Sequence, residues 1–176
     1  MKKITMIMVG VLLLAGACFS RASDEPKAMA DLHNAQGERA GIVLFEEAQD
    51  GVRIDIIITN LPAGEHAFHI HESPNCDRPD FKSAGGHFNP GGTKHGFLNP
   101  EGPHAGDLPN IVVKGDGTLI KKVVTDLITL DEGEKNSLFR GAGTSVVIHE
   151  NPDDYITDPA GRGGKRIACG TIRKIE

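Results

Sequence analysis

The stretch HAFHIHESPNC at residues 66–76 opens a segment that ends with KHGFLNPEGPHAGD at residues 94–107. Six of the eight histidines of the chain lie in this segment: His66, His69, His71, His87, His95 and His104. The other two are His33 and His149. Neutral imidazole is the commonest metal ligand in proteins, so this clustering indicates a metal site.

His69 and His71 are separated by one residue, Ile70. On a β-strand, residues i and i+2 point to the same face, so both imidazoles can bind one ion while Phe68 and Ile70 face a core. On a helix the two side chains would lie about 200° apart, too far to share an ion. We therefore expect a strand here. His66 falls on the opposite face of such a strand, so we interpret it as a structural residue bonded to a backbone carbonyl.

The later histidines of the segment lie among prolines and glycines. Five prolines interrupt residues 72–107, which predicts a long irregular loop. A loop of this length is uncommon in a compact domain unless a ligand or a function orders it. Three imidazoles and one aspartate of this loop make a closed four-ligand set that suits tetrahedral zinc. These residues are His87, His95, His104 and Asp107.

Short alternating segments outside this loop predict an all-β fold. Val52, Ile54, Ile56 and Ile58 alternate with Arg53, Asp55 and Thr59, a pattern typical of a strand with one buried face. Strands are expected at residues 28–34, 40–46, 52–59, 67–71, 110–114, 119–130, 144–149 and 166–175. Eight short strands favour an antiparallel sandwich or flattened barrel, and residues 150–165 form a second long loop in this interpretation.

Several motifs occur in the order in which one family carries them. They are His69-x-His71, Gly86-His87-Phe88-Asn89-Pro90, Lys94-His95-Gly96, His104-Ala105-Gly106-Asp107-Leu108, Val147-Ile148-His149-Glu150 and Arg166-Ile167-Ala168-Cys169-Gly170. On these residues the chain resembles the copper,zinc superoxide dismutase family, of the bacterial exported type, over residues 28–174. The resemblance implies that the eight strands form an antiparallel Greek-key sandwich with two long functional loops.

The resemblance also implies copper and zinc as cofactors that share one ligand. The implied copper ligands are His69, His71, His87 and His149, and the implied zinc ligands are His87, His95, His104 and Asp107. An all-imidazole set suits copper in both of its oxidation states. His87 belongs to both sets, as an imidazolate bridge with one metal on each ring nitrogen.

Two further residues match functional positions of the family. Asp153 matches the aspartate that accepts hydrogen bonds from His69 and His95, although the adjacent Asp154 leaves the register open. The alternative is an ordinary solvated loop acid. Arg166 matches the active-site arginine, whose guanidinium would hold a small anion. Its alternative is an ordinary arginine at a strand edge. With His87, Arg166 is the expected catalytic residue.

The activity that the resemblance implies is dismutation of the superoxide anion to dioxygen and hydrogen peroxide. The implied copper redox cycle has two steps, and His87 carries a proton while zinc performs no redox chemistry. A second hypothesis is a non-catalytic domain of the same family that binds or delivers copper. Such domains typically lack a copper ligand or the arginine, and this chain has both. A third hypothesis, a single-metal zinc hydrolase, requires an open zinc position.

Residues 1–22 are expected to be a signal peptide, with the superoxide dismutase domain at residues 23–176. Lys2 and Lys3 precede the apolar run of residues 4–17. Two processing sites fit: cleavage after Ala22, or a lipoprotein-type leader that ends at Cys18 and anchors the protein to a membrane by lipid. Either one predicts export to the periplasm or cell envelope.

Export makes the remaining cysteines and the charge informative. With Cys18 in the leader, Cys76 and Cys169 are expected to form a disulfide, the alternative being two buried free thiols. Loss of residues 1–22 leaves 16 basic against 24 acidic residues, a net charge of about −8. This charge argues against nucleic acid and anionic membranes as partners.

An anionic substrate needs local positive charge in such a chain. Arg166 can focus the field at one cleft, and Arg162 and Lys165 are candidates to assist it. The surfaces that carry subunit contacts lie in variable loops, so monomer and homodimer both remain open.

Overall fold

The computed structural model describes residues 27–175. The expected leader, residues 1–22 with Cys18 and both processing sites, lies outside these residues. In the described part of the chain, no helix has the length and apolar character needed to cross a membrane. The one helix found there is the single 3₁₀ turn η1 at Lys82–Ala84.

Residues 27–175 contain ten strands, and every pairing between these strands is antiparallel. They are β1 (Ala28–Asn34), β2 (Arg39–Ala48), β3 (Gly51–Ile58), β4 (Gly64–His66), β5 (Phe68–His71), β6 (Ile111–Val113), β7 (Leu119–Thr125), β8 (Ser145–His149), β9 (Arg166–Thr171) and β10 (Arg173–Lys174). The main sheet has the order β5-β8-β9-β1-β2-β3-β7, β10 pairs with β1, and β4 pairs with β6.

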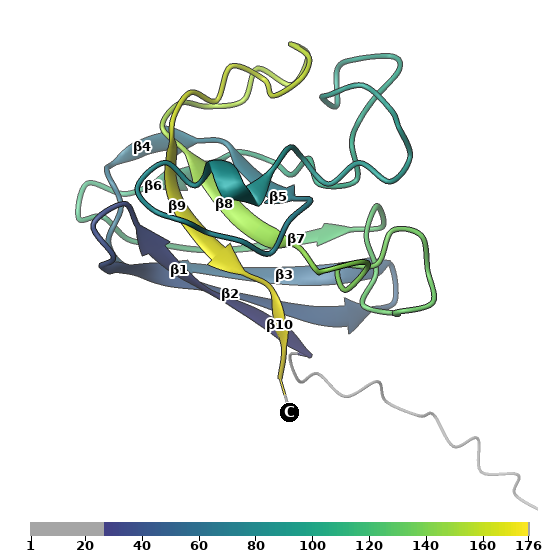
Figure 1. Ribbon diagram of the computed structural model, residues 1–176. Coiled ribbons are helices and arrows are strands. Elements are labelled where there is room, and N and C mark those ends of the chain that lie inside the picture. Colours follow the sequence, from purple (N-terminus) through teal and green to yellow (C-terminus); the bar gives the residue numbers. More distant parts are fainter. Residues whose placement is uncertain (1–26, 176) are drawn as a thin grey trace, which may run out of the picture.

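The main sheet curls on itself, so that β1, β2 and β3 form a layer facing β5 and β8 (Figure 1). β7 follows β6 in sequence but pairs with β3, and β8 then crosses back to pair with β5 and β9. These crossing connections are those of a Greek key. The expected antiparallel Greek-key sandwich is therefore confirmed. The two long loops lie at the same end of the molecule, at the top of Figure 1.

All eight expected strands are present, one of them is divided, and one further strand precedes the His-x-His pair. The further strand is β4, which is separated from β5 at Ala67. The N–H of Ala67 donates to the carbonyl of Asn151 (2.8 Å), and its own carbonyl accepts from the N–H of His149 (2.9 Å). The last expected strand divides at Ile172, whose N–H donates to Thr144. In both places the backbone leaves one strand partner and joins another.

The strand expected at residues 119–130 is shorter than predicted. β7 ends at Thr125 because its partner β3 begins at Gly51, and the last paired residues are Val52 and Thr125. After Thr125, no strand among the described residues lies beside the chain to form backbone hydrogen bonds with it. Ile128 and Leu130 are nevertheless buried in the core, which explains why the apolar alternation continues past the end of the strand.

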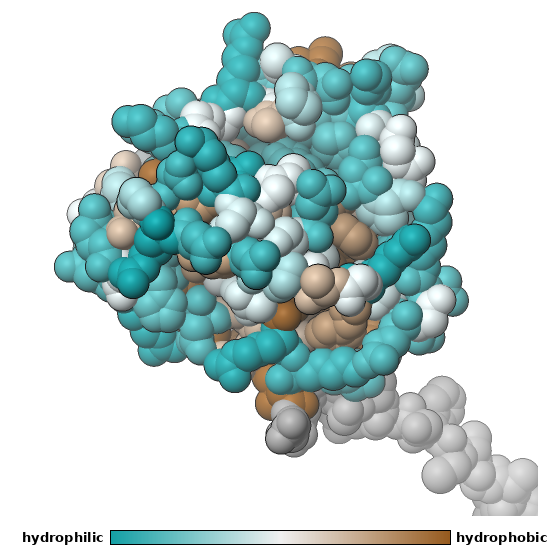
Figure 2. All heavy atoms as spheres, viewed as in Figure 1, coloured by the Kyte–Doolittle hydropathy of each residue, from teal (hydrophilic) through white to brown (hydrophobic). Residues whose placement is uncertain are grey.

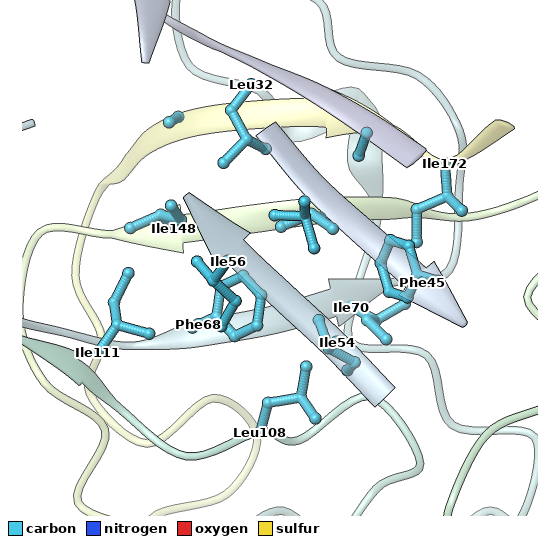
Figure 3. Close-up of a cluster of buried hydrophobic side chains, with 14 of the residues drawn as sticks. Leu32, Phe45, Ile54, Ile56, Phe68, Ile70, Leu108, Ile111, Ile148 and Ile172 are labelled. Carbon is cyan, nitrogen blue, oxygen red and sulfur yellow. The ribbon is translucent and has the colours of Figure 1, made fainter. Parts of the chain in front are cut away.

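The apolar core lies between the two layers of the sandwich. Phe45 and Ile54 on one layer point toward Phe68, Ile70 and Ile148 on the other (Figure 3), and all five are fully buried. Burying each such side chain contributes roughly 1.5–3 kcal/mol relative to its exposure. The face shown in Figure 2 is mostly hydrophilic, with small and scattered hydrophobic areas. The core packing of Phe68, Ile70 and Ile148 holds β5 and β8 in place. The opposite faces of these two strands carry His69, His71 and His149.

A disulfide joins Cys76 to Cys169, with a Cα–Cα distance of 5.7 Å and a sequence separation of 93 residues. The expected pairing is thus present, and two free thiols are ruled out. The bridge ties the loop before η1 to β9, where a small second cluster contains Phe81, Ala84 and Val147. The disulfide and this cluster together restrain the loop against β8 and β9.

Replacing Cys76 and Cys169 together by serine should lower the free energy of unfolding by about 2–5 kcal/mol, because the unfolded chain loses a long-range constraint. Urea denaturation of the metal-free protein measures this change. Wild-type protein treated with a thiol reductant is the control and should fall to the same value. An unchanged denaturation midpoint would show that the loop is held without the bridge.

Candidate metal centre and active site

The histidines of β5 and β8 lie on the outer face of the sheet, opposite the core. His69 and His71 alternate with the core residues Phe68 and Ile70, as the His-x-His spacing predicts. His149 ends β8, where the register against β9 shifts after Ile148. The shift brings His149 beside His71, and their Nε2 atoms lie 3.4 Å apart. β5, β8 and the register shift at the end of β8 thus bring the imidazoles of His69, His71 and His149 together.

A fourth imidazole, His87, comes from the long loop and completes this group. One ligand atom from each of His69, His71, His87 and His149 lies within 4.8 Å of the others. Nδ1 of His69 and Nε2 of His87 are buried and have no hydrogen-bond partner among the described residues. Unpaired buried polar atoms are costly, and a bound cation would satisfy both. The four residues therefore fit copper.

The second group converges on the carboxylate of Asp107. Its Oδ1 lies 2.8 Å from Nδ1 of His87, 3.1 Å from Nδ1 of His95 and 3.3 Å from Nδ1 of His104. Its Oδ2 accepts hydrogen bonds from the backbone N–H groups of Gly96 and His104. Three imidazole nitrogens and one carboxylate oxygen at one point form a closed tetrahedral set, which fits zinc.

The ring of His87 spans both groups. Its Nδ1 faces Asp107, while its Nε2 faces the group formed with His69, His71 and His149. The ring is packed against His69, with a distance of 4.0 Å between the ring centroids. Sequence spacing alone could not indicate this shared position, which came only from the family resemblance.

Asp153 connects the two groups through one histidine of each, His69 and His95. Its Oδ2 lies 2.8 Å from Nε2 of His69, and its Oδ1 lies 2.9 Å from Nε2 of His95. Burial would raise the pKa of Asp153, but the hydrogen bonds from the two histidines hold that pKa well below its ordinary value. Asp154, by contrast, accepts hydrogen bonds from Ile156 and Thr157 in its own turn. Of the two adjacent aspartates, the structure therefore favours Asp153 as the one that contacts the metal-binding histidines.

Arg166 lies in the wall of a cleft that leads to His149. The cleft has a volume of about 350 Å³ and is lined by residues 157–160 and 162–164, with His149 and Arg166. The two terminal nitrogens of the guanidinium donate to the carbonyls of Phe81 and Gly85, each at 2.6 Å. The carbonyl of Gly85 also lies 3.0 Å from Nδ1 of His71. The disulfide-linked loop thus orients Arg166 beside the histidines.

Three polar residues that the sequence did not single out support the site. Asn110 exchanges hydrogen bonds with the backbone of Asp153, and the hydroxyl of Tyr155 accepts from the N–H of Asn110. Asp158 accepts from the N–H of His95. Each is a single polar residue in irregular backbone, so no sequence pattern could have identified it.

Two histidines, His66 and His33, lie outside both metal groups, and His66 has the structural role expected of it. His66 is buried, and its ring nitrogens lie 2.8 Å from the carbonyl of His149 and 2.9 Å from the carbonyl of Pro62. It is a structural residue that joins β4 to the end of β8. His33 is exposed on β1.

Burial and mutual repulsion lower the pKa of three imidazoles of the first group, His71, His87 and His149, in the metal-free protein. Burial is the main cause and the charges of neighbouring histidines add to it, and together they lower the pKa of His149 to about 3 and that of His87 to about 4. Burial likewise lowers the pKa of His71 well below its ordinary value. A neutral imidazole keeps the lone pair that binds a metal. His95 differs: burial opposes its charge, but hydrogen bonds to Asp107 and Asp153 raise its pKa to about 9.

Comparisons with known proteins agree with this arrangement. The family model for copper/zinc superoxide dismutase (SODC) matches residues 39–172. The chain belongs to the copper/zinc superoxide dismutase family. It is 53% identical to superoxide dismutase [Cu-Zn] 2 of Aquifex aeolicus (strain VF5), over 98% of this chain and 100% of the relative.

Solved structures of the family share the fold. A superoxide dismutase-like protein from Bacillus subtilis has a TM-score of 0.78 and 41% identity, over 81% of this chain and 96% of the other. The Cu/Zn superoxide dismutase from Brucella abortus has a TM-score of 0.67 and 32% identity, over 84% and 100%. The protein is an oxidoreductase that dismutates superoxide, and its cofactors are copper and zinc.

The metal-free protein should lose stability as pH rises from about 6.5 toward about 9. Folding raises the pKa of His95 to about 9, so the stability gained from its protonated form is complete below the unfolded pKa and disappears above the folded one. Thermal denaturation across this range measures the effect. Zinc-loaded protein is the control, since its His95 carries no proton on Nδ1. If the thermal midpoint of the metal-free protein did not change with pH over this range, the raised pKa of His95 would be contradicted.

Proposed function

We propose that copper is held by His69, His71, His87 and His149, that zinc is held by His87, His95, His104 and Asp107, and that superoxide reacts at the copper group. The observation that carries this proposal is the position of His87. Its Nδ1 lies 2.8 Å from Oδ1 of Asp107, and its Nε2 is buried without a hydrogen-bond partner in the described part of the chain. One ring therefore serves two closed ligand groups.

When bound, copper supplies the one-electron chemistry of both half-reactions, and zinc supplies a fixed positive charge without redox chemistry. His87 holds a proton at Nε2 in one half of the cycle and donates it to the peroxide product. Its Nδ1 stays directed at the zinc group throughout, so the ring keeps its place while the proton on its other nitrogen comes and goes.

Arg166 binds the superoxide anion beside His149. Two of its N–H groups are used by the carbonyls of Phe81 and Gly85, so the guanidinium plane is fixed and does not follow the substrate. Its charge persists at any working pH. Arg166 therefore holds the anion at the mouth of the copper group, in the cleft that His149 lines.

Asp153 acts as a positioning residue. Its two oxygens accept from Nε2 of His69 and Nε2 of His95, which directs Nδ1 of each ring toward its own metal. Such carboxylate–histidine contacts fix the ring orientation and raise the basicity of the ligand. One buried carboxylate thus aligns one ligand in each group.

The activity is tested with mature protein loaded with one copper and one zinc, beside a His149→Ala variant. We expect rapid catalysed decay of superoxide in the wild type and its loss in the variant, because the copper group loses a ligand. His33→Ala, which changes an exposed histidine, is the control and should keep full activity. An inactive wild type with both metals bound would instead support copper binding or delivery without catalysis.

Asp153→Asn should weaken binding of both metals by roughly 10–100-fold, because an amide cannot accept from both histidines. Competition with a chelator measures the affinity for each metal. Asp154→Asn is the matched control: it changes a neighbouring acid that contacts neither ligand, and its effect should be much smaller. Equal effects of the two variants would place the cause in the loop rather than in the carboxylate contacts.

Residues 1–22 are proposed to direct export to the periplasm or cell envelope, which the disulfide supports because such bridges persist in oxidising compartments. Mass spectrometry of the processed N-terminus distinguishes cleavage before Ser23 from a lipid-modified Cys18. Sedimentation of the mature protein distinguishes a monomer from a homodimer.

A further inference from the structure

A cavity of about 1030 Å³ adjoins the copper cleft, and the two share Gly164 and Arg166 in their walls. Four segments border this cavity: the turn at residues 34–36, residues 60–62 after β3, residues 79–82 of the disulfide-linked loop, and residues 164–167 at the start of β9. Its volume is at the upper end of the range of small-molecule sites. Apart from Arg166, none of its lining residues has a role in the metal centre described above.

The walls of the cavity are held by contacts of their own. Oδ1 of Asn34 accepts from the N–H of Gln36 at 3.0 Å, which closes the first turn. The guanidinium of Arg166 donates to the carbonyl of Phe81 at 2.6 Å, which ties residues 79–82 to the start of β9. A cavity bordered by such fixed segments exists before a ligand arrives, so binding costs little ordering of the chain.

One part of the cavity lining is apolar. Four lining side chains carry no polar atom: Leu61, Pro62, Pro79 and Ile167. Leu61 is 6% exposed and belongs to the core, so this part of the wall is continuous with the packed interior. An apolar group of a ligand is stabilised against such a surface, and each methylene that it buries strengthens binding about fourfold.

Another part of the lining is cationic. Nζ of Lys82 lies 2.8 Å from the carboxylate of Asp80, which also lines the cavity, so these two charges offset each other. Lys165 and Arg166 have no carboxylate partner among residues 27–175. Carbonyl oxygens occupy two of the five N–H donors of Arg166, which leaves three for a ligand. The cavity therefore offers two free cations beside an apolar wall.

We propose that this cavity binds a small amphipathic carboxylate, with its apolar body against Leu61 and the two prolines and its carboxylate on Lys165 and Arg166. A planar guanidinium matches a carboxylate geometrically, whereas a bare inorganic anion would leave the apolar wall uncovered. In the function proposed above, Arg166 also holds superoxide. The bound carboxylate takes N–H donors that superoxide would use, so it inhibits dismutation. This inhibition rests on the proposed function, but the binding itself does not.

Binding is tested by calorimetric titration of the copper- and zinc-loaded protein with octanoate, and we expect one octanoate per chain. Hexanoate, which has two methylenes fewer, should bind about 15-fold more weakly. Lys165→Gln should weaken octanoate binding about fivefold, because one cation that contacts the carboxylate is lost. Arg162→Gln is the matched control, since it removes the same charge from the same loop at a residue that does not line this cavity. Its octanoate affinity should equal that of the wild type.

A third variant separates this cavity from direct binding of the carboxylate to copper. Asn60→Trp places a large side chain at an exposed lining position far along the chain from every metal ligand, and it should abolish octanoate binding. An unchanged thermal midpoint checks that this variant is folded. Absence of octanoate binding to the wild type would overturn the proposal. Equal affinities of Lys165→Gln and Arg162→Gln, or full affinity of Asn60→Trp, would also overturn it.

The shared use of Arg166 is tested with azide, whose affinity is measured by optical titration of the oxidised protein. Octanoate should lower the azide affinity and the superoxide decay rate of the wild type, and it should change neither in Asn60→Trp. Octanoate that binds but leaves azide affinity unchanged would overturn the inhibition. Calorimetry does not depend on catalysis, so an inactive loaded protein, which would contradict the proposed function, is distinguishable from a cavity that binds no carboxylate.

Discussion

The structure depends on the burial of a polar cluster on the outer face of one sheet. Eight residues of the two metal groups and their support, His69, His71, His87, His95, His104, Asp107, His149 and Asp153, are all less than a tenth exposed. Burying so many ionisable groups is costly unless each has a partner. Asp107 and Asp153 satisfy five imidazole nitrogens between them. Nδ1 of His69 and Nε2 of His87 are buried without a partner among the described residues, and a bound copper ion would satisfy both.

The inner face of the sheet packs in the core, and the outer face carries the metal ligands. Phe68, Ile70 and Ile148 face inward and hold β5 and β8 against the opposite layer. The alternate residues of the same strands face outward and carry the ligands, so packing energy and metal chemistry do not compete for the same side chains. The first long loop supplies the remaining ligands, and the second long loop supplies Asp153. A rigid sheet with functional loops at one end accounts for both the precision and the burial of the site.

Much of the frame was predictable because it follows from short-range periodicity. The alternation of β3 and the His-x-His pair of β5 each determine a strand without knowledge of its partner. Where an element depends on its partner, prediction was wrong: β7 ends at Thr125 because β3 begins at Gly51. The supporting contacts of Asn110, Tyr155 and Asp158 join distant loop residues, which local sequence does not encode. The shared role of His87 was available only through family resemblance, because spacing cannot show which ring nitrogen faces which group.

The position of the apolar core has a consequence for how the protein matures. Its buried residues come from the strands and pack between the layers, and none of them needs a ligand to complete its contacts. The disulfide likewise forms between residues that bind no metal. The sandwich can therefore assemble first, with both metals entering a scaffold that already exists. Under the export proposed above, copper and zinc would bind an already folded domain at its destination.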